Sequence, residues 1–401
     1  MTIGCPECGA LEDIPPLNAR GIARCRVCHY PLERRSGRSI NAALACSATT
    51  VILLFPANLA PLMTVHLLGA ERSSVLASGI VSMWHGGWVI PAFLLCMFGI
   101  VFPFVRFGAL ALVLTMVQFQ WRFKRIGALF RWALWLDIWA MPDVYLVGCF
   151  VGYSRVTQNL TGTVGAGGYC FIAAALMSML TRASLDRRTV WRAIAPEQEP
   201  PKGEPALSCT VCDLVEPASR EGEPCARCGR TLHSRKPDAM VRAAALSLAA
   251  LVLTLPANLF PMTFSIQLGQ DVPHRIVDGV YELFQAGLWP LGILITCTSI
   301  VIPVAKIVGM GWFIASIRRR SRKYLRLKAH LFRLIDELGR WSNVDVFTIA
   351  AFIPLIRFGD VASSRPAVGA TAFALVVFFT MLASRAFDPR MMWDTYLRRR
   401  S

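Results

Sequence analysis

Charged residues are scarce in this 401-residue chain, and acidic residues are the scarcest of them. They make up 17% of the sequence, against about 25% in ordinary soluble domains. Only 25 are Asp or Glu whereas 42 are Lys or Arg, which gives a net charge of +17. The sequence has no P-loop, no glycine-rich nucleotide-binding motif and no HExxH motif. We therefore expect neither an ATPase nor a zinc peptidase, and no enzyme.

Long uncharged runs take the place of the missing charges. Residues 44–62, 83–105, 107–121 and 366–384 contain no Asp, Glu, Lys or Arg, and the mean hydropathy of the chain is +0.49. A helix needs about 20 apolar residues to cross a hydrocarbon layer about 30 Å thick. The sequence therefore predicts a multi-pass membrane protein.

Basic residues gather in the short segments between the apolar runs. One segment carries Arg122, Lys124, Arg125 and Arg131, and seven more lie between Arg318 and Lys328. Such clusters are typical of cytoplasmic loops. No aromatic-interleaved basic patch or reading motif accompanies them, so we expect no nucleic-acid partner.

An internal repeat divides the chain into a first half, residues 1–206, and a second half, residues 207–401. The tetrapeptide Pro-Ala-Asn-Leu at 56–59 recurs at 256–259. At the same offset of 200 residues, Arg106 matches Lys306, and at an offset of 202 Asp143 matches Asp345. So many collinear matches indicate a duplication.

Each half begins with four cysteines in two Cys-x-x-Cys pairs. They are Cys5, Cys8, Cys25 and Cys28, then Cys209, Cys212, Cys225 and Cys228. This spacing is typical of a zinc ribbon, and four thiolates favour Zn²⁺ with iron as the competitor. The alternatives are disulfides or redox-active pairs, but the basic loops and the even number of spans in each half predict a reducing, cytoplasmic location for the cysteines. We expect two structural zinc sites.

The repeat predicts an all-α integral membrane protein with two tandem four-helix transmembrane units, each preceded by a small zinc-ribbon module. The predicted boundaries are 1–38 and 207–236 for the ribbons, 39–183 and 237–386 for the units, 184–206 for a linker, and 387–401 for a cytoplasmic tail. The predicted helices are 40–63, 84–117, 132–153 and 165–182, then 240–263, 286–315, 340–357 and 366–384. We expect Pro103 and Pro303 to kink the second helix of each unit.

The duplicated cysteine module followed by a helix with Pro-Ala-Asn-Leu resembles the paraquat-inducible protein A family of Gram-negative inner-membrane proteins. The resemblance covers nearly the whole chain. It implies tetraspanin-like membrane units, cytoplasmic zinc ribbons and a C-terminus on the cytoplasmic side. It also implies phospholipid traffic between the inner and outer membranes, with a periplasmic MCE-domain tunnel protein as the partner.

Ionisable residues inside membrane spans are functional candidates, because burying their charge is costly. Lys306 and Asp345 form such a pair in the second half, and Ser299 and Thr380 could complete a polar cluster. In a member of this family the four residues resemble a transport or proton-coupling site. The alternative is a static ion pair or a lysine that reaches the membrane surface.

The first half has Arg106 and Asp143 at the matching positions. An arginine does not lose its proton in a protein, whereas a buried lysine can, so we expect the first half to be a structural copy. Asn58 and Asn258 follow prolines in the first helix of each unit. Their amides could cap carbonyl groups freed by Pro56 or Pro61 and the matching prolines, or contact a lipid headgroup or a partner.

Three functions remain open at this point. The chain could pass lipids to or from the tunnel protein, with proton movement as the candidate driving force. It could instead anchor and assemble the tunnel without moving lipid. The third possibility is a membrane redox protein that uses the Cys-x-x-Cys pairs.

Overall fold

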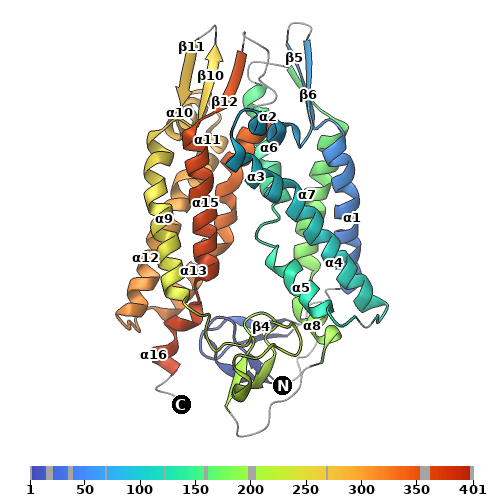
Figure 1. Cartoon of the computed structure of the whole chain (residues 1–401), viewed down its shortest axis with the longest axis vertical. Helices are drawn as coiled ribbons and strands as arrows, with labels where there is room; N and C mark the ends of the chain where they lie inside the picture. The colour runs from blue at the N-terminus through green and yellow to red at the C-terminus, as the bar shows by residue number, and fades with distance from the viewer. Residues whose placement is uncertain are drawn as a thin grey trace.

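Two helical bundles stand side by side, joined at one end by the cysteine modules and ending in small β-sheets at the other (Figure 1). The computed structural model describes residues 2–14, 21–34, 39–67, 70–121, 123–157, 161–196, 205–267, 270–352 and 362–397. We call these two ends of the molecule the module end and the sheet end.

The second half repeats the order of the longer helices of the first half and differs from it in short helical segments. The first half has α1 (Ile40–Leu59), α2 (Ser78–His85), α3 (Val89–Leu95), η1 (Cys96–Val101), α4 (Phe102–Gln118), α5 (Ile126–Trp135), α6 (Pro142–Val156), α7 (Ala166–Ser184) and α8 (Arg187–Ile194). The second half has α9 (Ala239–Leu259), α10 (Ile276–Gln285), α11 (Trp289–Thr296), η3 (Cys297–Val301), α12 (Ile302–Arg318), α13 (Leu325–Leu338), η4 (Gly339–Asn343), α14 (Val344–Phe352), α15 (Val368–Ala386), η6 (Pro389–Met392) and α16 (Asp394–Leu397). Helix α8 lies in the segment that was predicted as a linker.

Six helices of the described residues are long and apolar enough to cross a membrane. They are Ile40–Leu59, Val89–Gln118, Ala166–Ser184, Ala239–Leu259, Trp289–Arg318 and Val368–Ala386. The predicted single helix at 132–153 is wrong: turn residues 136–141 separate α5 from α6, which has 15 residues. In the second half, η4 precedes α14, and residues 353–357 of the predicted helix 340–357 lie outside the described residues.

A π-helical segment precedes the internal proline of each long helix. The segments η1 and η3 each end one residue before a helix that has proline at its second position, Pro103 or Pro303. A proline ring collides with the carbonyl group four residues earlier, and a wider turn relieves that collision. The predicted kink is therefore a local widening within a continuous helical rod.

The all-α prediction missed two three-stranded antiparallel sheets at the sheet end. The first sheet has the strand order β6-β5-β7, from β5 (Met63–Leu67), β6 (Ala70–Ser74) and β7 (Thr161–Val164). The second has the order β11-β10-β12, from β10 (Thr263–Gln267), β11 (Gln270–His274) and β12 (Ala362–Pro366). In each half the sheet pairs the hairpin that follows the first long helix with the strand that precedes the last long helix.

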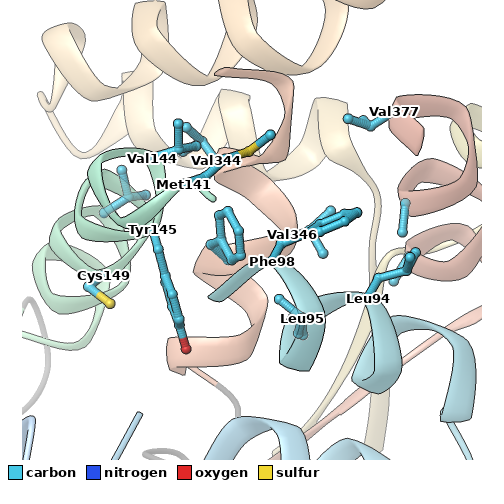
Figure 2. Close-up of a cluster of buried hydrophobic side chains, with 14 of the residues drawn as sticks. Leu94, Leu95, Phe98, Met141, Val144, Tyr145, Cys149, Val344, Val346 and Val377 are labelled. Carbon is cyan, nitrogen blue, oxygen red and sulfur yellow. The ribbon is translucent and has the colours of Figure 1, made fainter. Parts of the chain in front are cut away.

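The interface between the halves is built on α6 and α14. A Cβ added at Gly148 of α6 would lie 2.7 Å from Cβ of Phe347, so the two helices approach backbone to backbone. The rings of Tyr145 and Phe347 stack with their centres 4.6 Å apart. Figure 2 shows part of this buried cluster, with Tyr145 and Cys149 of α6 beside Phe98 and Leu95. Close packing of this kind makes the two bundles one body.

The cysteine modules are exchanged between the halves. The first module, with β1 (Thr2–Gly4), β2 (Leu11–Asp13), β3 (Ile22–Arg24) and β4 (Pro31–Arg34), shares a core with Phe313, Phe332 and Trp393 of the second half. The second module, with β8 (Ala206–Ser208), β9 (Val215–Pro217) and η2 (Ala218–Arg220), shares a core with Leu110, Phe130 and Trp191 of the first. Each module therefore covers the membrane helices of the opposite half.

Candidate metal centres and intramembrane polar site

Each cysteine module brings its four sulfur atoms together in a buried cluster. The Sγ atoms of Cys5 and Cys28 lie 3.4 Å apart and those of Cys8 and Cys25 3.6 Å apart. In the second module the corresponding distances are 3.6 Å for Cys209 and Cys228 and 3.5 Å for Cys212 and Cys225. Four thiolates at about 2.3 Å from one ion would lie about 3.8 Å from each other in a tetrahedron. Each group therefore has the size and chemistry of a closed tetrathiolate metal site.

Tight turns hold each Cys-x-x-Cys pair open toward the centre of its cluster. The residue after the second cysteine has a positive φ in all four pairs: Gly9, His29, Asp213 and Gly229. In the first turn the Gly9 N–H donates to the Cys5 carbonyl at 2.9 Å, and the Cys5 N–H donates to the Ala10 carbonyl at 2.8 Å. These bonds use the backbone groups of the turn and leave the thiolates free for the metal.

Charged residues of the opposite half surround the first cluster. Burial raises the pKa of the Glu7 carboxyl to about 7, and attraction by Arg333 and Arg390 opposes the rise. Arg333 of α13 lies 3.7 Å from Glu7 and stacks over the Tyr30 ring. In the second module, the Arg131 guanidinium of α5 donates to the Cys228 carbonyl at 2.8 Å. Ion pairs and hydrogen bonds thus reinforce the crossed docking.

The intramembrane residues of the second half fall into two levels rather than one cluster. At the level nearer the sheet end, the buried Ser299 hydroxyl of η3 donates to the Asp345 carboxylate of α14. At the level nearer the module end, the buried Lys306 ammonium of α12 donates to the Gly339 carbonyl at 3.1 Å and to the Thr380 hydroxyl at 3.3 Å. The ion pair between Lys306 and Asp345, which was the alternative to a transport site, is not among the ion pairs of the described residues.

A cavity of about 70 Å³ lies beneath the second sheet and reaches the first of these levels. Asp345 and Thr348 line it from α14, while His274 and Arg275 line it from the sheet end. The cavity places Asp345 toward the sheet end of the bundle. The reason is that α13 and η4 run from the module end back toward the sheet end, so that α14 begins inside the bundle.

The first half holds its buried arginine in a network of carboxylates. Arg106, 3% exposed, pairs with Asp137 at 2.6 Å, and Asp137 also pairs with Arg182 at 3.1 Å and with Arg187 at 2.8 Å. Asp143 pairs with Arg182 at 2.7 Å and lies 3.8 Å from Arg340 of the second half. The predicted counterparts Arg106 and Asp143 therefore belong to one network, and Asp137 joins them.

Both asparagines of the repeated tetrapeptide hydrogen-bond to their own helix. The Asn58 amide donates to the Leu54 carbonyl at 2.7 Å, and the Asn258 amide donates to the Thr254 carbonyl at 2.8 Å. Each capped carbonyl lies four residues before its asparagine. The carbonyls that the prolines free lie four residues before each proline, and these are different groups.

Sequence reasoning missed Asp137, Arg182, Gly339 and Arg340. The repeat offset carried a signal for two of them, because Asp137 of the first half aligns with Gly339 of the second at the offset of 202 residues. The first copy has a carboxylate at this position and the second copy has a glycine, so the two copies differ in charge there.

Comparisons with known proteins agree with this architecture. The sequence model of the paraquat-inducible protein A family matches residues 40–195 and 240–396, which are the two repeats. The chain is 29% identical over 399 residues to the lipophilic envelope-spanning tunnel protein A of Escherichia coli K12, covering 98% of this chain and 91% of that protein. It is 27% identical over 403 residues to the intermembrane transport protein PqiA of the same strain, covering 97% and 95%.

A probable intermembrane transport protein of Haemophilus influenzae is 26% identical over 401 residues, covering 98% of this chain and 95% of that protein. No solved structure gives a significant match. Because both repeats match the family and the similarity extends over nearly the full length, this chain belongs to the paraquat-inducible protein A family.

Proposed function

We propose that this chain is the inner-membrane subunit of an intermembrane lipid transport system. It passes phospholipids to or from a periplasmic tunnel built of MCE domains, and proton movement through the second half drives the transfer. The names of the relatives, which describe intermembrane transport and an envelope-spanning tunnel, support the transport class. The observation that carries the coupling is the buried Lys306, held by two neutral oxygen atoms.

The two levels of polar groups suggest an order for the proton. Asp345 lines the cavity that reaches the sheet end, so a proton that enters there meets Asp345 and its donor Ser299 first. Lys306 lies seven residues after Ser299 on the same helical rod, about 10 Å deeper. A change of charge at Asp345 and then at Lys306 would alter the packing of α12 against η4 and α15. That movement is the step that we propose to couple to lipid.

The cysteine modules hold structural zinc in this proposal and lie in the cytoplasm with the C-terminus. The basic loops beside them support this orientation. Bound zinc would supply only cross-linking of the fold, because all four ligand positions are thiolates and none is left open. The chain's own residues would use that cross-link to hold the module ends of the two bundles together.

The redox alternative fits the cysteine geometry less well. All four sulfur atoms of each module lie within 4.8 Å of one another, as the corners of one tetrahedral site require. The shortest contacts, 3.4 to 3.6 Å, join cysteines of different Cys-x-x-Cys pairs. A redox pair would bring together the two sulfurs of one motif. The scaffold alternative stays open, since an anchoring protein would share the same fold, and the experiments below separate it from transport.

Affinity purification from native membranes tests the partner. We expect an MCE-domain protein and phospholipid to copurify with the tagged chain, and their absence at every detergent tried would overturn the proposal. Transport in a deletion strain then tests the coupling. Asp345→Asn and Lys306→Ala should abolish transfer of radiolabelled phospholipid to the outer membrane while the partner still copurifies.

Two exposed residues give matched controls. Glu337→Gln neutralises a carboxylate that is 73% exposed, and Lys323→Ala removes an exposed lysine of the basic loop. Both should transport normally. Normal transport by Asp345→Asn and Lys306→Ala as well would exclude proton coupling through these residues and leave the scaffold.

A further inference from the structure

Lys306 lies directly across the backbone of Gly339. A Cβ added at Gly339 would lie 2.5 Å from the Lys306 Nζ and nearer still to Cε, whereas real Cβ atoms essentially never come closer than 3.0 Å. Lys306 is only 2% exposed, so its ammonium has no solvent to move into. The space that a side chain at residue 339 would fill is occupied by the lysine.

The backbone gives no other reason for glycine at this position. Gly339 has φ −60° and ψ −26°, which is ordinary right-handed helical geometry that every residue adopts. Glycine in such a place is less stable than alanine, because it loses more conformational freedom on folding. The residue that explains the glycine is therefore Lys306 and not the turn.

Gly339 and Thr380 together suit both protonation states of the amine. The Thr380 hydroxyl donates its own hydrogen to the Val377 carbonyl at 2.9 Å, so that it receives the Lys306 bond as an acceptor. The Gly339 carbonyl is the second acceptor. A charged ammonium has three N–H donors and a neutral amine has two, so both bonds persist when one proton leaves.

The first half shows what the same position does when it carries a carboxylate. Asp137, which aligns with Gly339, binds Arg106 at 2.6 Å together with Arg182 and Arg187. Those two arginines align with Ser384 and Pro389 in the second half. At the aligned positions the second half thus lacks this carboxylate and both of its other partners. The charged group that acts on Lys306 there is Asp336 of α13, which lies beyond ion-pair distance.

We propose that Gly339 is a positioning residue for Lys306: its missing side chain and its free carbonyl place the buried amine where it can lose and regain a proton. The positioning is a claim about packing and stands by itself. Its consequence for transport rests on the proposed function. The two parts therefore need separate measurements.

A double-mutant cycle on stability tests the positioning. In the parent protein, Gly339→Ala should lower the unfolding temperature, because the methyl group displaces the lysine. In a Lys306→Ala background the same change should raise the unfolding temperature, because the collision is gone and alanine is the better helix former. A sign reversal of this kind cannot arise from a glycine that is needed only for the fold.

Gly311→Ala is the matched control for the cycle. Gly311 lies on the same helix as Lys306, and an added Cβ would meet no atom within 4 Å. Its effect on the unfolding temperature should be the same in both backgrounds. If Gly339→Ala also has the same sign and size in both backgrounds, Gly339 does not position Lys306 and the inference is wrong.

The pH profile of lipid transport tests the consequence. Gly339→Ala should change the shape of the profile, because a displaced amine meets different neighbours. Gly167→Ala is the control for mere instability, since a Cβ there would strike the Ala60 backbone in the first half, far from Lys306. It should scale transport down with the amount of folded protein and leave the shape unchanged.

The two measurements separate the possible failures. A sign reversal in stability together with an unchanged pH profile would uphold the positioning and reject proton coupling at Lys306. The variant Gly339→Asp with Lys306→Arg, which copies the first half, should restore stability and block transport at every pH. Transport by that variant at the parent rate would overturn the assignment of a titratable role to this site.

Discussion

The two halves share one architecture but treat their buried cation in opposite ways. In the first half Arg106 is fixed by Asp137, which also binds two further arginines. In the second half the hydrogen bonds that Lys306 makes within the described residues go to neutral oxygens, at Gly339 and Thr380, while Asp336 attracts it from beyond ion-pair distance. A guanidinium in a carboxylate network keeps its charge, whereas a buried amine among neutral acceptors can exist without it. In our proposal the first copy therefore stays fixed and the second changes its charge.

The exchanged modules keep the two unlike halves in register. Each cysteine cluster belongs by sequence to one half and packs on the membrane helices of the other. A movement in the second half would therefore be transmitted to the first module, which packs on it. Arg390 of η6 contacts both modules, because it donates to the Pro6 carbonyl at 3.2 Å and to the Ser208 hydroxyl at 3.5 Å. The fixed copy thus has a mechanical contact with the changing one.

Metal removal should have the largest effect on the comparison. Structural zinc contributes on the order of 10–16 kcal/mol to small zinc modules, so Cys25→Ser should unfold the first module. Because that module covers Phe313 and Phe332, amide exchange should rise in α12 and α13 of the second half. Cys225→Ser should instead raise exchange in α4 and α5 of the first half. Metal analysis and hydrogen–deuterium exchange measure both effects.

The control for metal removal is Cys297→Ser. Cys297 is an exposed single cysteine in η3 and should leave metal content and exchange unchanged. Increased exchange in the half to which the mutated module belongs by sequence would contradict the crossed docking.

Asp137→Ala should be the most damaging single change in the fixed network. It removes the carboxylate from the buried Arg106 and leaves an unpaired charge, which costs about 3–5 kcal/mol. We expect a lower yield of folded protein and a lower unfolding temperature in detergent. Asp143→Ala should do less, because Arg106 keeps Asp137. Equal losses of stability for the two variants would show that Asp137 is not the central carboxylate of this network.

The sequence carried the class of the molecule and the ligands of the metal sites. Long apolar runs, the 200-residue repeat and the Cys-x-x-Cys spacing are local signals. They predicted both cysteine clusters and eight membrane helices, of which six are long and apolar enough to span a membrane in the described residues. The packing of each module on the opposite half could not be predicted from such local signals, because it depends on surfaces that are far apart in the sequence. The sheets were missed because Met63–Leu67 and Thr263–Gln267 are short strands beside long apolar helices.

The partners of the buried charges were the least predictable part. Spacing along one helix placed Ser299 and Lys306 two turns apart, and the structure agrees. Their contacts come from η4, α14 and α15, whose relative height depends on the break that precedes α14. The expected single cluster therefore separated into a pair at Asp345 and a pair at Thr380.

Replacing each buried cation with methionine should change stability differently in the two halves, by less than the changes above. Arg106→Met deletes a 2.6 Å ion pair and should lower stability by about 1–3 kcal/mol. Lys306→Met removes a charge whose hydrogen bonds go to neutral oxygens, so stability should stay the same or rise, while transport is lost. Unfolding temperatures measured in one detergent give the comparison. A destabilisation by Lys306→Met as large as that by Arg106→Met would erase the difference between the copies.

The weakest expected effect concerns the charge contact between the membrane parts of the two halves. Arg340 follows Gly339 in η4 and lies 3.8 Å from Asp143, which keeps its closer partner Arg182 at 2.7 Å. Arg340→Ala should therefore lower stability by at most about 1 kcal/mol. Because the two side chains are 19% and 2% exposed, high salt should change that difference little. Glu337→Ala removes the exposed partner of Arg340 and serves as the control, with no expected effect. If Arg340→Ala instead slows transport without changing stability, the network of the first half takes part in the cycle of the second. The first half would then be a counterpart in the mechanism and not only a fixed copy.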